Sequence, residues 1–127
     1  MNNLSNNTKE KSLVSYELFI ETSLDKLGFR KNTLGTKYLK DLILFTYEQN
    51  IYNIFINRIS SDYLEYKQLN HISQKMFLDN INYAIKNVDY QKFKDNFYFV
   101  FHSEYDIYYL STKNIVILFI NALEKQI

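Results

Sequence analysis

Cysteine, proline and tryptophan are absent from this sequence, and glycine occurs only twice. Without cysteine there is no disulfide framework, no thiolate nucleophile and no cysteine-based metal site, which fits a reducing compartment. The longest apolar run, Ile115–Ile120, is six residues and far too short to span a bilayer. The first residues also lack the apolar segment of a signal peptide. We therefore expect a cytoplasmic protein with no membrane partner.

Charges of the two signs almost cancel. The sequence has 15 basic and 14 acidic residues, so its formal net charge is +1 at pH 7. Such a chain has no broad electrostatic field that would hold nucleic acid or an anionic membrane without specificity. Any binding of nucleic acid must therefore depend on where individual charged residues lie.

Residue patterns that carry catalysis are also missing. The two histidines, His71 and His102, are isolated from any metal-ligand spacing, and neither Gly28 nor Gly35 belongs to a phosphate-binding loop. The carboxylates are scattered at helical spacings, as on a solvated surface. We therefore expect no enzyme, no catalytic or metal-binding residues, no cofactor and no small-molecule substrate.

What the chain does have is material for a core. Apolar residues make up 46% of the sequence and aromatic residues 17%, and 127 residues suffice for one domain of ordinary size. Residues 1–11 are polar, Asn-rich and without periodicity, and we predict a disordered tail there. Residues 12–127 are predicted to form a single all-α domain, a compact multi-helix fold.

Helical periodicity begins at once in this domain. Apolar residues at steps of three and four predict a first helix over residues 12–27, with Gly28 at the position of a helix C-cap. A second periodic segment ends near Asn50, and either Thr33 or Thr36 is expected to cap its start.

Three further segments are less regular. Residues 51–59 fit a short helix or a strand, and we predict a helix because the neighbouring segments are helical. After a helical turn or two at 89–95, the aromatic stretch 97–110 is predicted to be a short β-hairpin or an extended aromatic strap over the helices. The last helix, 112–125, is more apolar than one buried face requires, so we expect it to lie in the core or to form a homodimer contact.

Between these segments lies a helix-turn-helix pattern. A short helix at 62–69, a turn at 70–72 and a second helix at 73–88 are expected, with Ser73 as the N-cap of the second helix. One stripe of that helix is apolar and predicted to be buried: Phe77, Ile81, Ala84, Ile85 and Val88. The opposite side carries Lys75, Asp79, Asn82 and Lys86, flanked by Leu78 and Tyr83. In such a motif the second helix can enter a DNA major groove, although plain helix packing produces the same pattern.

The segment GFRKNTLGTKYLKDLI, residues 28–43, resembles the opening of the DNA-binding effector domain of the sporulation stage-zero master response regulator. In that family a helix ends in Gly, and a loop leads to Gly-x-x-Tyr-Leu, a basic residue, an acidic residue, any residue and Ile. The matching residues here are Gly28, Gly35, Tyr38, Leu39, Lys40, Asp41 and Ile43. The resemblance continues in YKQLN, INYAIKN and STKNIVILFINALEK, so that it covers about residues 12–125.

The resemblance implies an all-α domain, built around a helix-turn-helix, that binds specific AT-rich operators in double-stranded DNA as pairs of protomers. This chain would be a stand-alone, divergent transcription regulator with a recognition helix at about 73–88. The residues expected to touch DNA are Lys75, Asp79, Asn82, Tyr83 and Lys86. Asn82 would read adenine bidentately, and the two lysines would reach guanine or phosphate. The family's receiver domain is missing, so control by phosphorylation is not expected.

The chain also departs from the family. Three arginines of the family's recognition helix fall on Met76, Asp79 and Asn82, and its histidine falls on Tyr83. An aspartate near DNA phosphates is repulsive, and the counterion-release contribution to affinity is expected to be small. The alternative is a degenerate protein-interaction module that has kept the fold and lost the operator, acting as an antagonist or partner of a full-length regulator.

Overall fold

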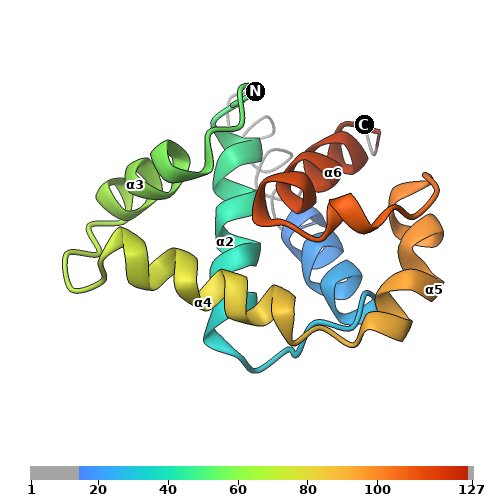
Figure 1. The fold of residues 1–127 in the computed structure, drawn as a ribbon. Coiled ribbons are helices and arrows are strands. Elements are labelled where there is room, and N and C mark those ends of the chain that lie inside the picture. Colours follow the sequence, from blue (N-terminus) through green and yellow to red (C-terminus); the bar gives the residue numbers. More distant parts are fainter. Residues whose placement is uncertain (1–14, 126–127) are drawn as a thin grey trace.

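The computed structural model describes residues 15–125, which fold into α-helices joined by loops and one 3-10 turn (Figure 1). No residue in this range lies in a β-strand, so the predicted all-α class is confirmed. The first helix comprises residues 15–26 of the described part. The later elements are α2 (Leu34–Glu48), α3 (Ile56–Tyr66), α4 (Gln74–Lys86), α5 (Tyr90–Phe101), η1 (Ile107–Tyr109) and α6 (Thr112–Glu124).

Gly28 follows the end of the first helix and caps it, as predicted. Gly28 has a φ of +89°. Its N–H donates to the carbonyl of Asp25 at 3.0 Å, and the N–H of Phe29 donates to the carbonyl of Leu24, also at 3.0 Å. This pair of bonds is the Schellman arrangement that a left-handed residue allows. The Gly28 carbonyl in turn accepts from the N–H of Asp89 at 2.9 Å, which ties the end of the first helix to the start of α5.

The helix α2 is the central element. Thr33 is its N-cap, with the side-chain oxygen accepting from the N–H of Thr36, so one of the two predicted caps is confirmed. In Figure 1 α2 runs behind α4 and beside α6, with α3 at its side, and it contacts all three. Its buried residues accordingly lie on several sides of the helix: Gly35, Thr36, Tyr38, Leu39, Leu42, Ile43, Phe45 and Thr46.

The helix α6 lies in the core. Ile115, Val116, Phe119 and Leu123 are fully buried within the chain. The ring of Phe119 packs edge-on against Phe101 of α5, with 5.1 Å between ring centroids. The surplus of apolar residues in this helix is therefore accounted for by packing inside one protomer. A homodimer through the C-terminal helix stays a prediction, but the surplus of apolar residues no longer supports it.

The β-hairpin predicted for residues 97–110 was wrong. The helix α5 extends to Phe101, so the first five residues of this segment, 97–101, are helical. The reason is that Phe93, Phe97 and Phe101 recur every four residues and are all buried on one helical face. His102, with a φ of +54°, ends the helix. The chain then returns along α5, where Tyr109 stacks on Phe97 at 5.3 Å between centroids. The alternative, an aromatic strap over the helices, describes this return more closely.

Three predicted boundaries also change. Residues 51–55 are not helical, and α3 begins only at Ile56. The helix predicted at 62–69 is the second half of α3, which ends at Tyr66, and α5 is longer than the predicted 89–95. The predicted disordered tail, 1–11, and the predicted start of the first helix at residue 12 lie outside the described residues. None of the described helices combines the length and the apolar character needed to cross a bilayer.

Candidate functional site

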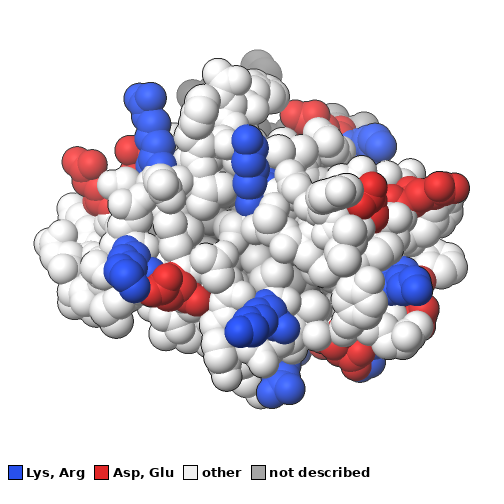
Figure 2. All heavy atoms as spheres, viewed as in Figure 1, with Lys and Arg blue, Asp and Glu red and all other residues white. Residues whose placement is uncertain are grey.

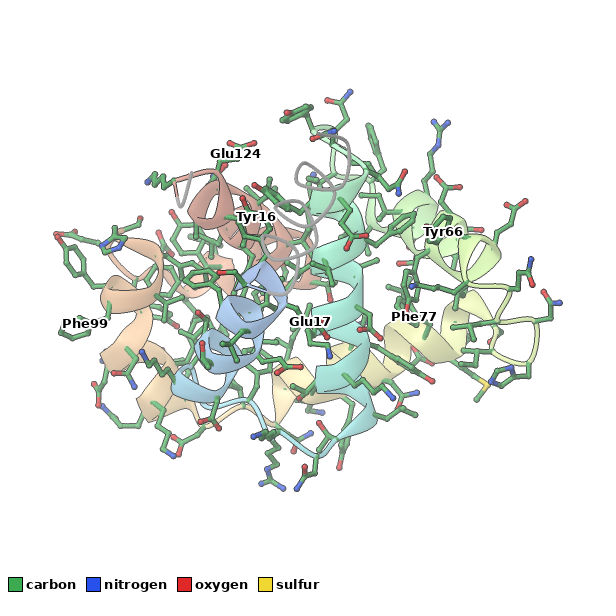
Figure 3. All side chains as sticks on the ribbon, turned by 180° about the vertical axis from the view of Figure 1, so that it is seen from behind. Tyr16, Glu17, Tyr66, Phe77, Phe99 and Glu124 are labelled. Carbon is green, nitrogen blue, oxygen red and sulfur yellow. The ribbon has the colours of Figure 1, made fainter. Side chains whose placement is uncertain are left out.

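The helix α4 is held by one buried face. Ser73 caps its start as predicted, accepting at its Oγ from the N–H of Met76 at 3.0 Å. Phe77 and Ile81 are fully buried, and Val88, the last residue of the predicted stripe, is half-buried. Figure 3 shows Phe77 from behind, where α4 meets α2 and α3. Its ring stacks on that of Tyr63 in α3 at 5.4 Å between centroids. These contacts fix which side of α4 faces outward.

Gly35 sets the distance between α2 and α4. A Cβ atom built on Gly35 would lie 2.0 Å from the carbonyl oxygen of Asn80 and 2.9 Å from the Cβ of Ala84. The two helices thus cross with their backbones in direct contact, and any side chain at this position would separate them. This contact therefore fixes the distance between α2 and α4.

All five predicted site residues lie on the exposed side of α4: Lys75, Asp79, Asn82, Tyr83 and Lys86. Met76 and Tyr83 expose 56% and 66% of their surface, so the face also contains apolar groups. This face is polar in its majority, and no other described element packs over it. Its chemistry is mixed, since cationic, anionic, amide and aromatic side chains stand side by side.

The charges on this face are partly paired with each other. Lys75 Nζ lies 2.8 Å from Asp79 Oδ2, one helical turn further on. The hydrogen bond with Asp79 and the charge of that carboxylate raise the pKa of Lys75. In this arrangement Asp79 is compensated, and Lys75 contributes little net positive charge. Lys86, in the last turn, has no such partner among the described side chains.

Asn82 joins α4 to the start of α6. The hydroxyl of Thr112, the first residue of α6, donates to the Oδ1 of Asn82 at 2.9 Å. Thr112 is only 7% exposed, whereas Asn82 is exposed. Because Thr112 begins its helix, no carbonyl of a preceding helical turn is available to its hydroxyl. Sequence reasoning missed Thr112, since no local pattern pairs two residues thirty positions apart.

An open groove of about 500 Å³ runs beside this bond, between α4 and the first residues of α3 and α6. Of the residues that line it, Lys86 and Lys113 are basic and none is acidic. Its lining also includes the apolar residues Leu78, Ile85 and Leu110. The part of α4 nearest to α6 is therefore the more positive end of the exposed face.

Away from α4, basic side chains either form ion pairs with carboxylates or are scattered over the surface. Lys40 Nζ lies 3.0 Å from Glu21 Oε1 and 3.2 Å from Glu17 Oε1. Burial lowers the pKa of Lys40, but the hydrogen bonds to Glu21 and Glu17 outweigh it, so the pKa is raised overall. On the face that α4 crosses, Figure 2 shows basic and acidic side chains interspersed in a larger uncharged surface, with no broad basic patch.

The residues that carry the family resemblance are structural in this chain. Gly28 and Gly35 stand at close backbone contacts, and Lys40 bridges α2 to the first helix. Asp41 accepts a hydrogen bond from the Tyr63 hydroxyl at 3.2 Å, which links α2 to α3. Burial raises the pKa of Asp41, while Lys40 and the Tyr63 hydrogen bond oppose that shift. These residues therefore hold together the helices that surround α4.

Residues 15–125 also contain hollows away from the exposed face of α4. A hollow of about 230 Å³ between the first helix and α2 is lined by charges of both signs: Glu21, Asp25, Lys31, Lys37 and Lys40. Within that same range, no three His, Asp or Glu side chains are grouped closely enough to hold a metal ion.

Comparison with known proteins adds no relative: no protein-family model, no curated protein and no solved structure matches this chain.

Proposed function

We propose that this chain is a sequence-specific, DNA-binding transcription regulator of the cytoplasm that inserts the exposed face of α4 into the major groove. In this proposal α3 and α4 form the helix-turn-helix, with α4 as the recognition helix. The residues that touch DNA are Lys75, Asp79, Asn82, Tyr83 and Lys86. The sporulation-regulator type is proposed from the sequence resemblance, with AT-rich operators as the class of site.

The observation that carries the proposal is that one face of α4 is fixed in the core while its other face is exposed. The buried face of α4 is fixed by Phe77, Ile81 and the Gly35 contact. The other face offers side chains that bind base edges and phosphates, an amide and two lysines. The loop between α3 and α4 spans residues 67–73, which is longer than the roughly three- or four-residue turn of the motif. A longer loop is compatible with the function, because α4 is positioned mainly by α2.

The second candidate is a protein-interaction module that has lost its operator and binds a full-length regulator as an antagonist or partner. Two observations favour it. The Lys75–Asp79 ion pair reduces the positive charge of the face, and Met76 and Tyr83 present apolar surface there. Aromatic and methionine side chains are enriched at the centres of protein interfaces.

Selection from a pool of random duplexes at low salt separates the two candidates. The parent is expected to enrich one motif, because α4 offers groups that distinguish base pairs. Lys86→Ala is expected to weaken binding to all sequences alike, since a lysine on phosphate carries no sequence information. Lys94→Ala, an exposed lysine on α5, is the matched control and should behave as the parent. Failure of the parent to enrich any motif would reject DNA recognition in favour of the interaction module.

A further inference from the structure

We propose that the groove beside α4 holds the sugar-phosphate backbone of one DNA strand, with Lys113 of α6 contacting a phosphate. This inference rests on the proposed function and adds a contact outside the recognition helix. The groove lies between α4 and the first residues of α3 and α6, and its volume is about 500 Å³. Asn82 and Lys86 line it and also belong to the exposed face of α4. The groove is therefore continuous with the surface proposed to face DNA.

The charges that line this groove are all positive. Lys86 and Lys113 are exposed, and no carboxylate lines the groove. Neither lysine forms an ion pair with a side chain of the described residues. The hollow between the first helix and α2 and the hollow between α2 and the end of α3 differ, because each is lined by two carboxylates as well as by lysine. Two uncompensated lysines at one open groove favour an anionic partner.

The place of the groove beside α4 identifies this anion as the DNA backbone. An α-helix with its side chains is about 10–12 Å across and the major groove is about 12 Å wide, so a helix inserted there fills it. The two phosphate backbones that border the major groove then run past the elements on either side of the helix. Because α6 begins beside α4 (Figure 1), its first residues meet one of these backbones. Leu78 and Leu110 in the lining offer apolar surface to the deoxyribose rings.

The backbone of Lys113 is held at a fixed place relative to α4. Ile115 and Val116, which follow it in α6, are fully buried. The hydroxyl of Thr112 is hydrogen-bonded to the side chain of Asn82 at 2.9 Å, which joins the start of α6 to α4. A cation placed in this way fixes the position of the duplex on the protein and carries no sequence information.

Duplex binding by Lys113→Ala, measured over a range of salt concentrations, tests the inference. The variant should bind every sequence more weakly than the parent, and the slope of log affinity against log salt should become shallower by about one, the value of one lost phosphate contact. Lys113→Arg keeps the charge and should keep the parent's slope. Lys94→Ala, which removes an exposed lysine from α5, is the matched control and should bind like the parent. An unchanged slope for Lys113→Ala, or an equal loss from Lys94→Ala, would overturn the inference.

Replacement of single phosphates by neutral methylphosphonates locates the contact. At one position the replacement should weaken binding by the parent and have no further effect on Lys113→Ala, because the lysine that held that phosphate is gone. If every replacement weakens the parent and the alanine variant equally, Lys113 contacts no phosphate and the inference fails while the proposed function stands. Absence of duplex binding by the parent is a different result, which overturns the proposed function and this inference together.

Discussion

At the scale of single residues, the two glycines lie where no side chain fits. Gly28 combines a left-handed backbone with the carbonyl of Asp89, which a Cβ atom would approach to 2.6 Å. Gly35 is different, because it sits in the first turn of a regular helix and its backbone conformation suits any residue. Only the contact with α4 requires glycine there. Whether a substitution at Gly35 raises or lowers the free energy of unfolding therefore shows whether α2 and α4 are in close contact there.

We predict that Gly35→Ala lowers the free energy of unfolding by about 1–3 kcal/mol, the usual range for overpacking a tight contact. In an isolated helix the same change would stabilise by about 1 kcal/mol, because alanine has the higher helix propensity. Lys37→Ala, at an exposed position of α2, is the control and should shift stability by about 0.5 kcal/mol or less. Denaturant unfolding measures all three proteins. A stabilised Gly35→Ala protein would show that the helices do not touch at this point.

At the scale of elements, the rotation of α4 about its own axis decides which residues meet a partner. Ile85 is 8% exposed and lies on the buried side, while Met76 is 56% exposed on the other side. The same chemical change at these two positions should therefore have opposite consequences.

We predict that Ile85→Asp unfolds the domain, because an unpaired carboxylate in the core costs more than a marginally stable fold can offset. Met76→Asp should remain folded, since it is exposed and lies in the first turn, where a negative charge is favoured. Circular-dichroism melts of both variants are the measurement. If Ile85→Asp melted like the parent, Ile85 could not lie on the side of α4 that packs against α2.

The elements predicted correctly from sequence were those determined by local chemistry. Ser73 and Thr33 cap helices because a hydroxyl beside a free N–H suffices, and the face of α4 follows from periodicity alone. The segment 97–110 was misjudged because aromatic residues suit a strand as well as a helix, and the spacing of Phe93, Phe97 and Phe101 outweighed composition.

Long-range partners were out of reach of the sequence. Of the site, the exposed residues of α4 were predicted, and an i,i+4 spacing was the signal that could have revealed the Lys75–Asp79 pair. The bond between Thr112 and Asn82 joins two helices whose relative position only the packed core determines. The same holds for the bond from Tyr63 to Asp41.

At the scale of the whole molecule, stability should depend on buried tyrosines at high pH. Burial raises the pKa of Tyr63, which is only 4% exposed, and the charge of Asp41 and the hydrogen bond to it raise it further. In the unfolded chain a tyrosine loses its proton near pH 10, its ordinary pKa. Above that pH the unfolded state binds fewer protons than the native state. The stabilisation is thus complete below pH 10 and is lost as the pH rises toward the native pKa.

We predict that the free energy of unfolding falls above about pH 10, with Tyr63 contributing about 1.4 kcal/mol per pH unit. Tyr63→Phe removes the ionisable group, so its free energy of unfolding should fall less steeply with pH than that of the parent. Each protein is compared with its own value near neutral pH. Denaturant unfolding along a pH series gives both slopes. Identical slopes would show that Tyr63 ionises as readily in the native state as in the unfolded chain.

The salt dependence of duplex binding is the measurement that shows whether the exposed face of α4 contacts DNA, as proposed. Asp79→Arg removes the acid that pairs with Lys75 and adds a cation on the same face. Asp95→Arg makes the same change of net charge on α5, where Asp95 is exposed and, among the described residues, accepts a hydrogen bond from Gln91. Each protein is titrated with one mixed-sequence duplex over a range of salt concentrations.

We predict that Asp79→Arg binds more tightly than the parent and steepens the slope of log affinity against log salt by about one, the value of one added phosphate contact. Asp95→Arg should match the parent in both quantities. The contradicting result is an equal gain from Asp95→Arg, which would mean that net charge and not α4 governs binding, or no duplex binding by the parent and Asp79→Arg alike.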